Sequence, residues 1–202
     1  MIAGPSEILI IADEQANASY IAADLMGQAE HDKLASAICI TTSPKLAQQI
    51  KEELCKQLPS MPRKEIIKES LKNYGAVIIV DSLKEATTLA NNLATEHLEL
   101  SVINPYEILD YINHAGAIFI GEYTPESVGD YFAGTNHTLP TSQTARFQSP
   151  LGVYDFIKRT SIIDYSKEAL LKDAPSIIRL ANEEGLYAHA NAVKIRMDGE
   201  QR

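Results

Sequence analysis

The sequence predicts an α/β protein in which a mostly parallel sheet is flanked by helices, with a small helical domain at the C-terminus. Two observations carry this prediction. As far as Gly121, short runs of β-branched and apolar residues alternate with stretches of helical periodicity. Strands that alternate with helices in this way are typical of a parallel sheet. From Val153 to the end the pattern is helical, which indicates a second, separate part of the chain.

Five short segments, each containing Val, Ile or Leu, are predicted as strands. The first, EILIIA, is apolar almost throughout and is expected to be buried. The fourth alternates apolar and polar residues, which is the period of a strand. The predicted strands cover residues 7–12, 36–42, 75–81, 97–103 and 117–121.

Helices are predicted between these strands, and two of them have clear start signals. Ser43 can cap a helix whose first residue is Pro44. Ser82 and Glu85 have the spacing of a capping box. The predicted helices cover residues 17–30, 44 onward, 63–73, 82–94 and 105–113.

The stretch from Gly121 to Gly152 is rich in Gly, Thr, Ser and Pro and is predicted to be irregular. Long irregular stretches in compact domains are usually functional. From Val153 onward helix is expected, ending in one long helix over 170–197 that is broken near Gly185. We therefore place a domain boundary near Pro150, between an α/β domain at 1–150 and a helical tail domain at 151–202.

Composition excludes several classes of protein. A chain of 202 residues, 45% of them hydrophobic, is long enough for one good core. Its formal net charge of -9 argues against a nucleic-acid partner, because phosphate binding needs a basic face. No apolar run is long enough to span a bilayer, and no leader pattern precedes the first strand. Neither a membrane partner nor a signal peptide is expected.

The two cysteines carry no recognisable motif. Cys39 lies in the apolar run AICI, where a small buried hydrophobic residue is a more frequent role than a nucleophile. Cys55 falls on a predicted helix. Because no disulfide framework is implied, a reducing, cytoplasmic location is expected.

Residues of the types that bind metals lie in short, distinctive stretches. Gln28 and His31 are three residues apart on a predicted helix, so their side chains share one face and can reach one ion. Asp130 lies in a predicted Gly-flanked loop, which can turn a carboxylate inward. His189 lies on the C-terminal helix, after Glu184. Imidazole and carboxylate ligands suit zinc, although each of these residues alone is more often a surface or turn residue.

An adjacent pair, Glu96 and His97, suits proton transfer. Neighbours on a strand point to opposite faces, so both can serve one site only if the turn into the strand holds them there. The ordinary alternative is a capping glutamate and a half-buried histidine. His114 lies outside these stretches and is expected to be a packed or solvated residue. From the residues alone, the chain is an α/β protein with a candidate metal site.

Several stretches, taken together and in order, resemble the signature of the histidinol dehydrogenase family. They are AGPSEILIIA at 3–12, DLMGQAEH at 24–31, TEHLEL at 95–100, ESVGDY at 126–131, AGTNHTLPT at 133–141 and LYAH at 186–189. The resemblance covers essentially the whole chain. It implies an NAD-dependent, four-electron oxidation of L-histidinol to L-histidine through the aldehyde, the last step of histidine biosynthesis.

The resemblance also implies roles for individual residues. It makes Gln28, His31, Asp130 and His189 the ligands of one zinc ion, which orients the substrate's imidazole and amino nitrogens. It makes His97 the base for the first oxidation, and Glu96 the residue that activates the water attacking the aldehyde.

Substrate contacts are implied for Ser6, His97 and His137, for Glu184, and for the four zinc ligands. Family members are homodimers with interlocked tails, so Glu184 and His189 are expected to come from the partner subunit.

The sequence departs from the family pattern in two ways. Gly27 stands where the family usually has Ser or Ala, and little effect is expected from another small residue. The family also carries a further N-terminal half that holds most of the NAD-binding domain, so this chain corresponds to a C-terminal half with an incomplete Rossmann-like layer. The strand at 7–12 is then expected to lack its preceding neighbours and to leave an exposed edge.

Three alternatives to an ordinary enzyme stay open at this point. The chain can be a truncated remnant that binds zinc and histidinol, one half of a split enzyme, or a stranded fragment that binds nothing well. We expect weak or no turnover from the chain alone, because most of the NAD domain is missing. The NAD-contacting residues cannot be assigned from this half.

Overall fold

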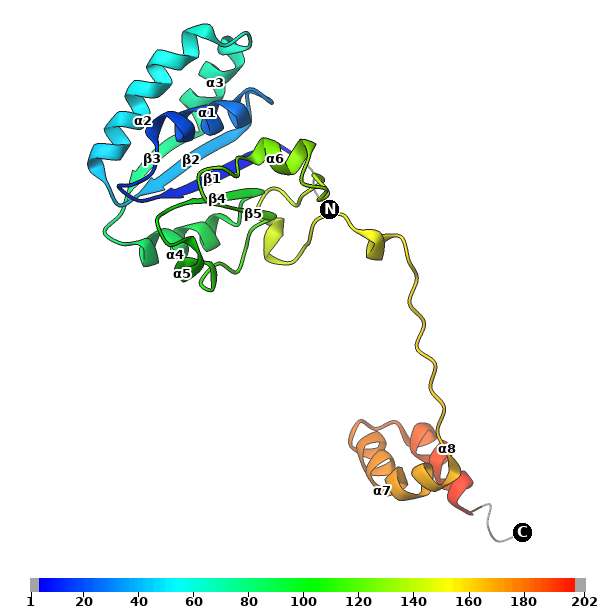
Figure 1. The fold of residues 1–202 in the computed structure, drawn as a ribbon. Coiled ribbons are helices and arrows are strands. Elements are labelled where there is room, and N and C mark those ends of the chain that lie inside the picture. Colours follow the sequence, from blue (N-terminus) through cyan, green and yellow to red (C-terminus); the bar gives the residue numbers. More distant parts are fainter. Residues whose placement is uncertain (1–3, 199–202) are drawn as a thin grey trace. The chain divides into compact units, whose positions relative to one another are not determined.

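The structure is a computed structural model that describes residues 4–198 (Figure 1). It divides the chain into two compact units, Met1–Phe156 and Ile157–Arg202, each of which is described by itself. The division falls between Phe156 and Ile157, shortly after the boundary at Pro150 that the sequence suggests.

The first unit is built on a parallel sheet of five strands in the order β3-β2-β1-β4-β5. This confirms the predicted fold class. The strands are β1 (Glu7–Ala12), β2 (Ser36–Thr41), β3 (Gly75–Ile79), β4 (His97–Ser101) and β5 (Ala117–Ile120).

The expectation that β1 would leave an exposed edge is wrong. β1 lies at the centre of the sheet, where it pairs with β2 on one side and β4 on the other. Both neighbours come from later in the chain, so β1 needs no preceding segment to be covered. The edges belong to β3 and β5.

Helices cover both faces of the sheet, with α1, α2 and α3 on one face and α4 and α5 on the other (Figure 1). Their bounds are α1 (Ala18–Ala29), α2 (Pro44–Gln57), α3 (Lys64–Tyr74), α4 (Leu83–Leu93) and α5 (Pro105–Leu109). The alternating side chains of β1 serve both layers: Ile8 and Ile10 pack toward α1–α3, while Leu9 and Ile11 pack toward α4 and α5.

The predicted start signals of two helices are confirmed. The Ser43 hydroxyl accepts the backbone N–H of Leu46 at 3.2 Å, and Pro44 is the first residue of α2. The Ser82 hydroxyl accepts the N–H of Glu85 at 3.2 Å and so starts α4. The Glu85 carboxylate accepts the N–H of Asp81 at 3.0 Å, which satisfies a further donor at this helix end.

Two predictions for the second half need correction. The stretch from Gly121 to Gly152 is not wholly irregular, because it contains the short helix α6 (Glu126–Tyr131). Helix does not begin at Val153: one 3₁₀ turn, η3 (Val153–Asp155), is followed by a segment without regular structure up to Ser166. That segment, FIKRTSIIDYS, contains three Ile and one Thr, whose branched side chains disfavour helix.

The second unit is a pair of helices, α7 (Lys167–Glu183) and α8 (Tyr187–Asp198). Ser166 caps α7 through a hydrogen bond from the N–H of Ala169 at 3.1 Å. Gly185, with φ +74°, ends the first helix, so the predicted break near Gly185 is confirmed. Within residues 4–198, no helix is both long enough and apolar enough to cross a membrane.

Candidate metal and acid–base site

The candidate site lies at the amino ends of β1 and β4, which are neighbours in the sheet. The register pairs Ile8 with His97, so the preceding residues Glu7 and Glu96 also meet. The end of α1 supplies Gln28, the turn that follows α1 supplies His31, and α6 supplies Asp130. His31 thus lies beyond the helix on which the sequence placed it together with Gln28. The first unit therefore brings together five of the residues that the sequence singles out: Gln28, His31, Glu96, His97 and Asp130.

The orientation of the His97 ring is fixed by the backbone of β1. Its Nδ1 lies 3.0 Å from the carbonyl oxygen of Glu7, so Nδ1–H donates there and Nε2 is the basic nitrogen. Nε2 is buried and has no hydrogen-bond partner among the residues that the structure describes. A buried, unpaired imidazole nitrogen is costly unless it meets a ligand or a proton donor.

The Glu96 carboxylate is held beside this ring. Its Oε2 accepts the backbone N–H of Glu7 at 3.0 Å and lies 3.5 Å from His97 Nδ1. The backbone of Glu96 is pinned in turn, because its carbonyl oxygen accepts the N–H of Ala117 at 2.8 Å. The turn into β4 thus holds both Glu96 and His97 at one site, and His97 is fully buried rather than half-buried.

Burial shifts the pKa of both groups. It raises the pKa of Glu96 to about 7; the neighbouring charges of Glu7 and Asp130 also raise it, and a hydrogen bond from Glu7 lowers it. Burial lowers the pKa of His97, against opposing effects of the Glu7 carbonyl and the Asp130 charge. A neutral imidazole can then accept a proton at neutral pH, and a carboxyl group with a pKa near 7 can both take and release one.

Glu126, at the start of α6, lies at the centre of the cluster, although the sequence patterns do not single it out. Its Oε1 lies 3.9 Å from His31 Nε2 and 3.9 Å from His97 Nε2. Ligand atoms of His97, Glu126 and Asp130 all lie within 4.8 Å of one another. A signal existed in the sequence, because Glu126 is four residues before Asp130 and so shares its face of a helix.

Asp130 is placed by helix packing, so the predicted Gly-flanked loop is wrong. Asp130 lies within α6, and Gly129 is needed for close approach: a Cβ at this position would lie 2.6 Å from the ring of Phe119. The same ring lies beside His97, with ring centroids 5.9 Å apart. Phe119 therefore packs against both α6 and the imidazole of His97.

Two further acids of the site, Asp24 and Glu99, are likewise not among the residues that the sequence analysis singles out. Glu99 is fully buried on β4, two residues after His97 and on the same face of the sheet, where it hydrogen-bonds to Asp24. Its Oε1 accepts the N–H of Glu126 at 2.9 Å. Burial and the charge of Asp24 raise the pKa of Glu99 well above its usual range, so Glu99 is the member of the pair that keeps its proton.

The donor set fits a divalent cation. Ligand atoms of His97, Glu126 and Asp130 converge within 4.8 Å of one another. The buried Gln28 amide lies beside them: its nitrogen donates to Glu126 Oε1 at 3.0 Å, and its carbonyl oxygen accepts the N–H of Glu7 at 3.0 Å. Imidazole, amide oxygen and carboxylate are suitable zinc ligands.

The other predicted site residues are not part of this cluster: two lie elsewhere in the first unit and two lie in the second unit. Ser6 is half-buried just before β1, and its carbonyl oxygen accepts the N–H of Ser36 at 3.0 Å. His137 is exposed in the stretch after α6. Glu184 caps the end of α7 and His189 lies in the first turn of α8, both exposed within the second unit.

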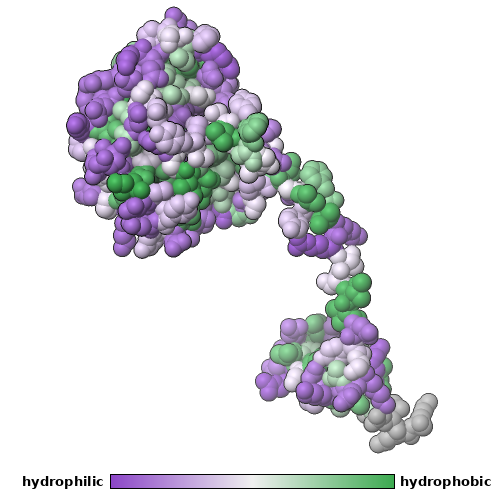
Figure 2. All heavy atoms as spheres, viewed as in Figure 1, coloured by the Kyte–Doolittle hydropathy of each residue, from purple (hydrophilic) through white to green (hydrophobic). Residues whose placement is uncertain are grey.

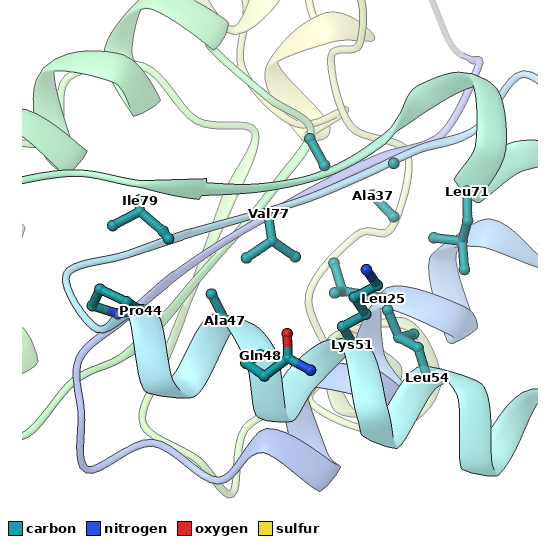
Figure 3. A pocket seen from close by; sticks show the side chains of 12 residues that line it. Leu25, Ala37, Pro44, Ala47, Gln48, Lys51, Leu54, Leu71, Val77 and Ile79 are labelled. Carbon is teal, nitrogen blue, oxygen red and sulfur yellow. The ribbon is translucent and has the colours of Figure 1, made fainter.

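Comparing two cavities of the first unit shows which of them is the candidate site. A hollow of about 280 Å³ opens beside it, lined by His31, Glu126 and Asp130 among others. A larger cavity, about 510 Å³, lies between α2 and β3 and is mainly apolar; Gln48 and Lys51 contribute its polar side chains (Figure 3). The residues described as lining it include no acid–base or metal-binding cluster, so the smaller hollow is the candidate site.

These features define a parallel α/β protein with an acid–base pair beside a set of metal-ligand side chains. The family model described as histidinol dehydrogenase matches residues 1–197. The chain therefore belongs to the histidinol dehydrogenase family.

Relatives named histidinol dehydrogenase include one from Bacillus cereus, 56% identical over 201 residues, which cover 100% of this chain and 47% of the relative. Another, from Halalkalibacterium halodurans, is 54% identical over the same share of each chain. The crystal structure of histidinol dehydrogenase from Elizabethkingia anophelis matches with a TM-score of 0.94 at 39% identity, covering 100% of this chain and 46% of that one. The chain spans about half the length of the curated relatives it matches.

Proposed function

We propose that this chain supplies the metal-binding and acid–base half of a histidinol dehydrogenase, which oxidises L-histidinol to L-histidine with NAD. Family membership supports the reaction, and the geometry of His97 is the observation that carries the proposal. Its Nδ1 is committed to the carbonyl oxygen of Glu7, which leaves a buried, unpaired Nε2 facing Glu126 beside the hollow. This is the arrangement that a general base requires.

In the first oxidation, His97 Nε2 takes the hydroxyl proton of histidinol while the carbon-bound hydrogen leaves as hydride to NAD. The products are the aldehyde, one NADH and a protonated His97. The lowered pKa of His97 keeps the imidazole neutral before this step, so that it can accept the proton.

In the second oxidation, the Glu96 carboxylate takes a proton from the water that attacks the aldehyde carbon. The protonated His97 gives its proton to the oxygen of the aldehyde, which completes the hydrate. The hydrate then loses hydride to a second NAD while His97 Nε2 takes one of its hydroxyl protons, and the carboxylic acid is formed. A pKa of about 7 suits this role, because Glu96 is then ionised in a large fraction of molecules and still basic enough to deprotonate water that is adding to an aldehyde.

Gln28, His31 and Asp130, together with His189, are proposed to hold zinc. Bound zinc would orient the imidazole and amino nitrogens of the substrate. Ser6 and His137 are proposed to contact the substrate, as is Glu184. The convergence of ligand atoms of His97, Glu126 and Asp130 within 4.8 Å of one another supports a divalent cation here.

NAD is proposed to bind mainly to the part of the relatives' chains that this chain does not cover. In open parallel sheets, dinucleotides bind at the carboxyl ends of the strands, on a glycine-rich turn. Here the turn after β1 carries Asp13 and Glu14, whose charges oppose phosphate. The Asp13 carboxylate is also committed to the N–H groups of Gln15 at 2.9 Å and Ile103 at 2.7 Å.

We propose that the working assembly is a homodimer in which Glu184 and His189 reach the partner subunit's site. The segment that follows the first unit supports a large interface. It exposes several apolar side chains, and Figure 2 shows green, apolar surface along it. These residues include Ile157, Ile162 and Ile163, of which Ile162 is 92% exposed. Exposed apolar surface of this kind marks an interaction site.

Two measurements test the proposal. Calorimetry should detect L-histidinol binding to the zinc-loaded chain and no binding to the Asp130→Asn variant. Mixing the chain with the separately produced remainder of the Bacillus cereus relative, which we term the reconstituted assembly, should give histidinol-dependent NADH. The chain alone should give little or none. Zinc and histidinol binding without NADH from the reconstituted assembly would favour a binding remnant instead.

A further inference from the structure

We propose that the side chain of Glu7 is a positioning residue for the water-activating glutamate: one oxygen of its carboxylate holds the backbone of Glu96, and the other anchors a strained turn at Ser142. The inference rests on the proposed function, because Glu96 is the residue proposed to activate water. It goes beyond that function by giving a role to a side chain outside the proposed metal ligands and the acid–base pair.

The first support is a reciprocal pair of hydrogen bonds between two glutamates. The N–H of Glu7 donates to Glu96 Oε2 at 3.0 Å, and the N–H of Glu96 donates to Glu7 Oε2 at 3.3 Å. Each carboxylate therefore holds the backbone of the other residue across the amino ends of β1 and β4. Hydrogen bonds from N–H groups to an ionised carboxylate are roughly twice as strong as bonds between neutral groups. The Glu7 carboxylate thus restrains the backbone from which the Glu96 side chain extends.

The second support is a backbone turn that the same carboxylate holds in a strained conformation. Ser142 and Gln143 have φ values of +54° and +65°, in the left-handed region. This conformation costs a residue other than glycine about 1–2 kcal/mol. Such strain persists only where surrounding contacts fix it, and it is frequent at functional sites. The N–H of Ser142 donates to Glu7 Oε1 at 3.1 Å, which is a contact of this kind.

The third support is where the anchored turn lies in the chain. It ends the stretch that carries His137, a proposed substrate contact. Just before the turn, Thr141 is fully buried, and its hydroxyl donates to the carbonyl oxygen of Gly4 at 3.1 Å. The stretch is therefore attached twice to the residues at the start of β1. Glu7 is the point at which this stretch, β1 and the turn into β4 are joined.

Substitutions of Glu7 can separate its side chain from its backbone. Glu7→Ala removes both carboxylate oxygens, but it keeps the N–H that holds the Glu96 carboxylate and the carbonyl oxygen that orients His97. Glu7→Gln keeps the size of the side chain but replaces one acceptor oxygen by an NH₂ donor. One of the two N–H groups, that of Glu96 or that of Ser142, then loses its partner.

The first experiment measures single-turnover rates at saturating substrate in the zinc-loaded reconstituted assembly. We expect Glu7→Ala to slow oxidation of the aldehyde about 10²-fold, the usual effect of displacing a reacting group by about 1 Å. The first hydride transfer from histidinol should be nearly unchanged, because the contact that orients His97 is kept. Glu14→Ala is the matched control, since Glu14 is an exposed acid beyond the other end of β1 and should behave as the parent.

A double variant shows whether Glu7 acts through Glu96. Adding Glu7→Ala to Glu96→Gln should slow aldehyde oxidation little further, because the group that Glu7 positions is already lost. Losses that multiply in the double variant would overturn the inference. So would a parental rate of aldehyde oxidation in Glu7→Ala, or equal losses in both oxidations, which a merely structural residue would cause.

The second experiment needs no activity and uses the 202-residue chain alone. Amide hydrogen exchange at Glu96 and Ser142 should be about tenfold faster in Glu7→Ala, as expected from loss of a hydrogen bond to a charged group. Glu14→Ala should leave both amides unchanged. Should Glu7→Ala fail to fold, Glu7→Gln decides: faster exchange is expected at one of the two amides.

The exchange result keeps this inference separate from the proposed function. Exchange at the parental rate at both amides in the folded variant would refute the role of Glu7, whatever the assembly catalyses. No NADH from the parent assembly would instead refute the proposed function, and faster exchange would still support the two contacts of the Glu7 carboxylate.

Discussion

At the scale of single residues, the chemistry of this site depends on backbone groups that fix two side chains. The carbonyl oxygen of Glu7 selects the His97 tautomer, and the N–H of Glu7 holds the Glu96 carboxylate. Both atoms belong to one residue at the start of β1. The acid–base pair is therefore set by strand pairing, which is more rigid than a loop.

The two catalytic roles predict different effects of substitution. In the reconstituted assembly, His97→Asn should slow oxidation of both histidinol and the aldehyde by about 10²- to 10⁴-fold, the usual contribution of a general base. Glu96→Gln should slow oxidation of the aldehyde by a similar factor and leave the first hydride transfer nearly unchanged. Single-turnover kinetics from each substrate distinguish the two. Equal losses on both substrates in Glu96→Gln would contradict the assigned role.

The buried Asp24–Glu99 pair predicts how stability depends on pH. The Glu99 carboxyl has the ordinary glutamate pKa of 4.5 in the unfolded chain and a raised pKa in the folded chain, mainly through burial. Between these values the folded chain holds a proton that the unfolded chain has lost, so stability falls as pH rises through this window. Below pH 4.5 both states hold the proton, and the contribution of Glu99 is constant.

Glu99→Gln should remove this dependence. The amide can still donate to Asp24 and still accept the N–H of Glu126, so packing is conserved. In metal-free buffer at about pH 8, the variant should be more stable than the parent by at least about 1.4 kcal/mol, the equivalent of one pKa unit. Urea unfolding at about pH 5 and about pH 8 measures the difference. A variant that loses stability with pH as steeply as the parent would show that Glu99 is not the group responsible.

At the scale of elements, Phe119 on β5 links the packing of α6 to that of the base. Its ring lies against Gly129 of α6 and near the ring of His97, with ring centroids 5.9 Å apart. Gly129→Ala should force α6 or the ring to move, at a cost of about 1–3 kcal/mol in stability from overpacking. It should also weaken zinc binding, because Asp130 moves with α6.

Gly27→Ala provides the matched control, since a Cβ there meets nothing within 4 Å. In the helix α1 this change should stabilise the chain by about 0.5–1 kcal/mol and leave zinc binding unchanged. Thermal unfolding and zinc titration of both variants check the prediction. Equal behaviour of the two alanine variants would mean that the contact between Gly129 and Phe119 does not position α6.

The sequence predicts where helices and strands begin better than it predicts which of them pack together. Caps such as Ser43 and Ser82 act within a few residues, so the helix starts are visible in the sequence. The central position of β1 depends on strands far along the chain, and pairing order is not encoded locally. Glu99 is two residues after His97 on a strand, and Glu126 is four residues before Asp130 on a helix, so each shares a face with a site residue. Their burial, however, depends on the tertiary packing of α1, α6 and β4.

At the scale of the whole molecule, the site lies at the amino ends of the strands, whereas cofactors in open parallel sheets bind at the carboxyl ends. The family resemblance selects Gln28, His31, Glu96, His97 and Asp130, and the first unit brings all five together. Glu184 and His189 lie in the second unit, and the role proposed for them requires a partner subunit. Where these two residues lie relative to a second subunit is a property of the assembly. It can be read neither from sequence periodicity nor from the structure of a single chain.

The proposed exchange of tails predicts complementation. In the reconstituted assembly, Asp130→Ala and His189→Ala should each be inactive as homodimers. A mixed dimer would contain one site with both groups intact, so mixing the two variants should restore about a quarter of the parent activity. Activity measured after subunit exchange tests this. No recovery in mixtures that form mixed dimers would mean that His189 acts within its own chain.

The central claim is that this chain provides the base, the water-activating acid and the metal ligands for two successive oxidations at one site. The most direct test counts NADH formed per molecule of L-histidinol in the zinc-loaded reconstituted assembly with excess NAD. The account predicts two NADH and one histidine, falling to about one NADH with accumulated aldehyde in a single turnover of Glu96→Gln. An assembly that forms, binds zinc and histidinol, and yields no NADH would contradict it.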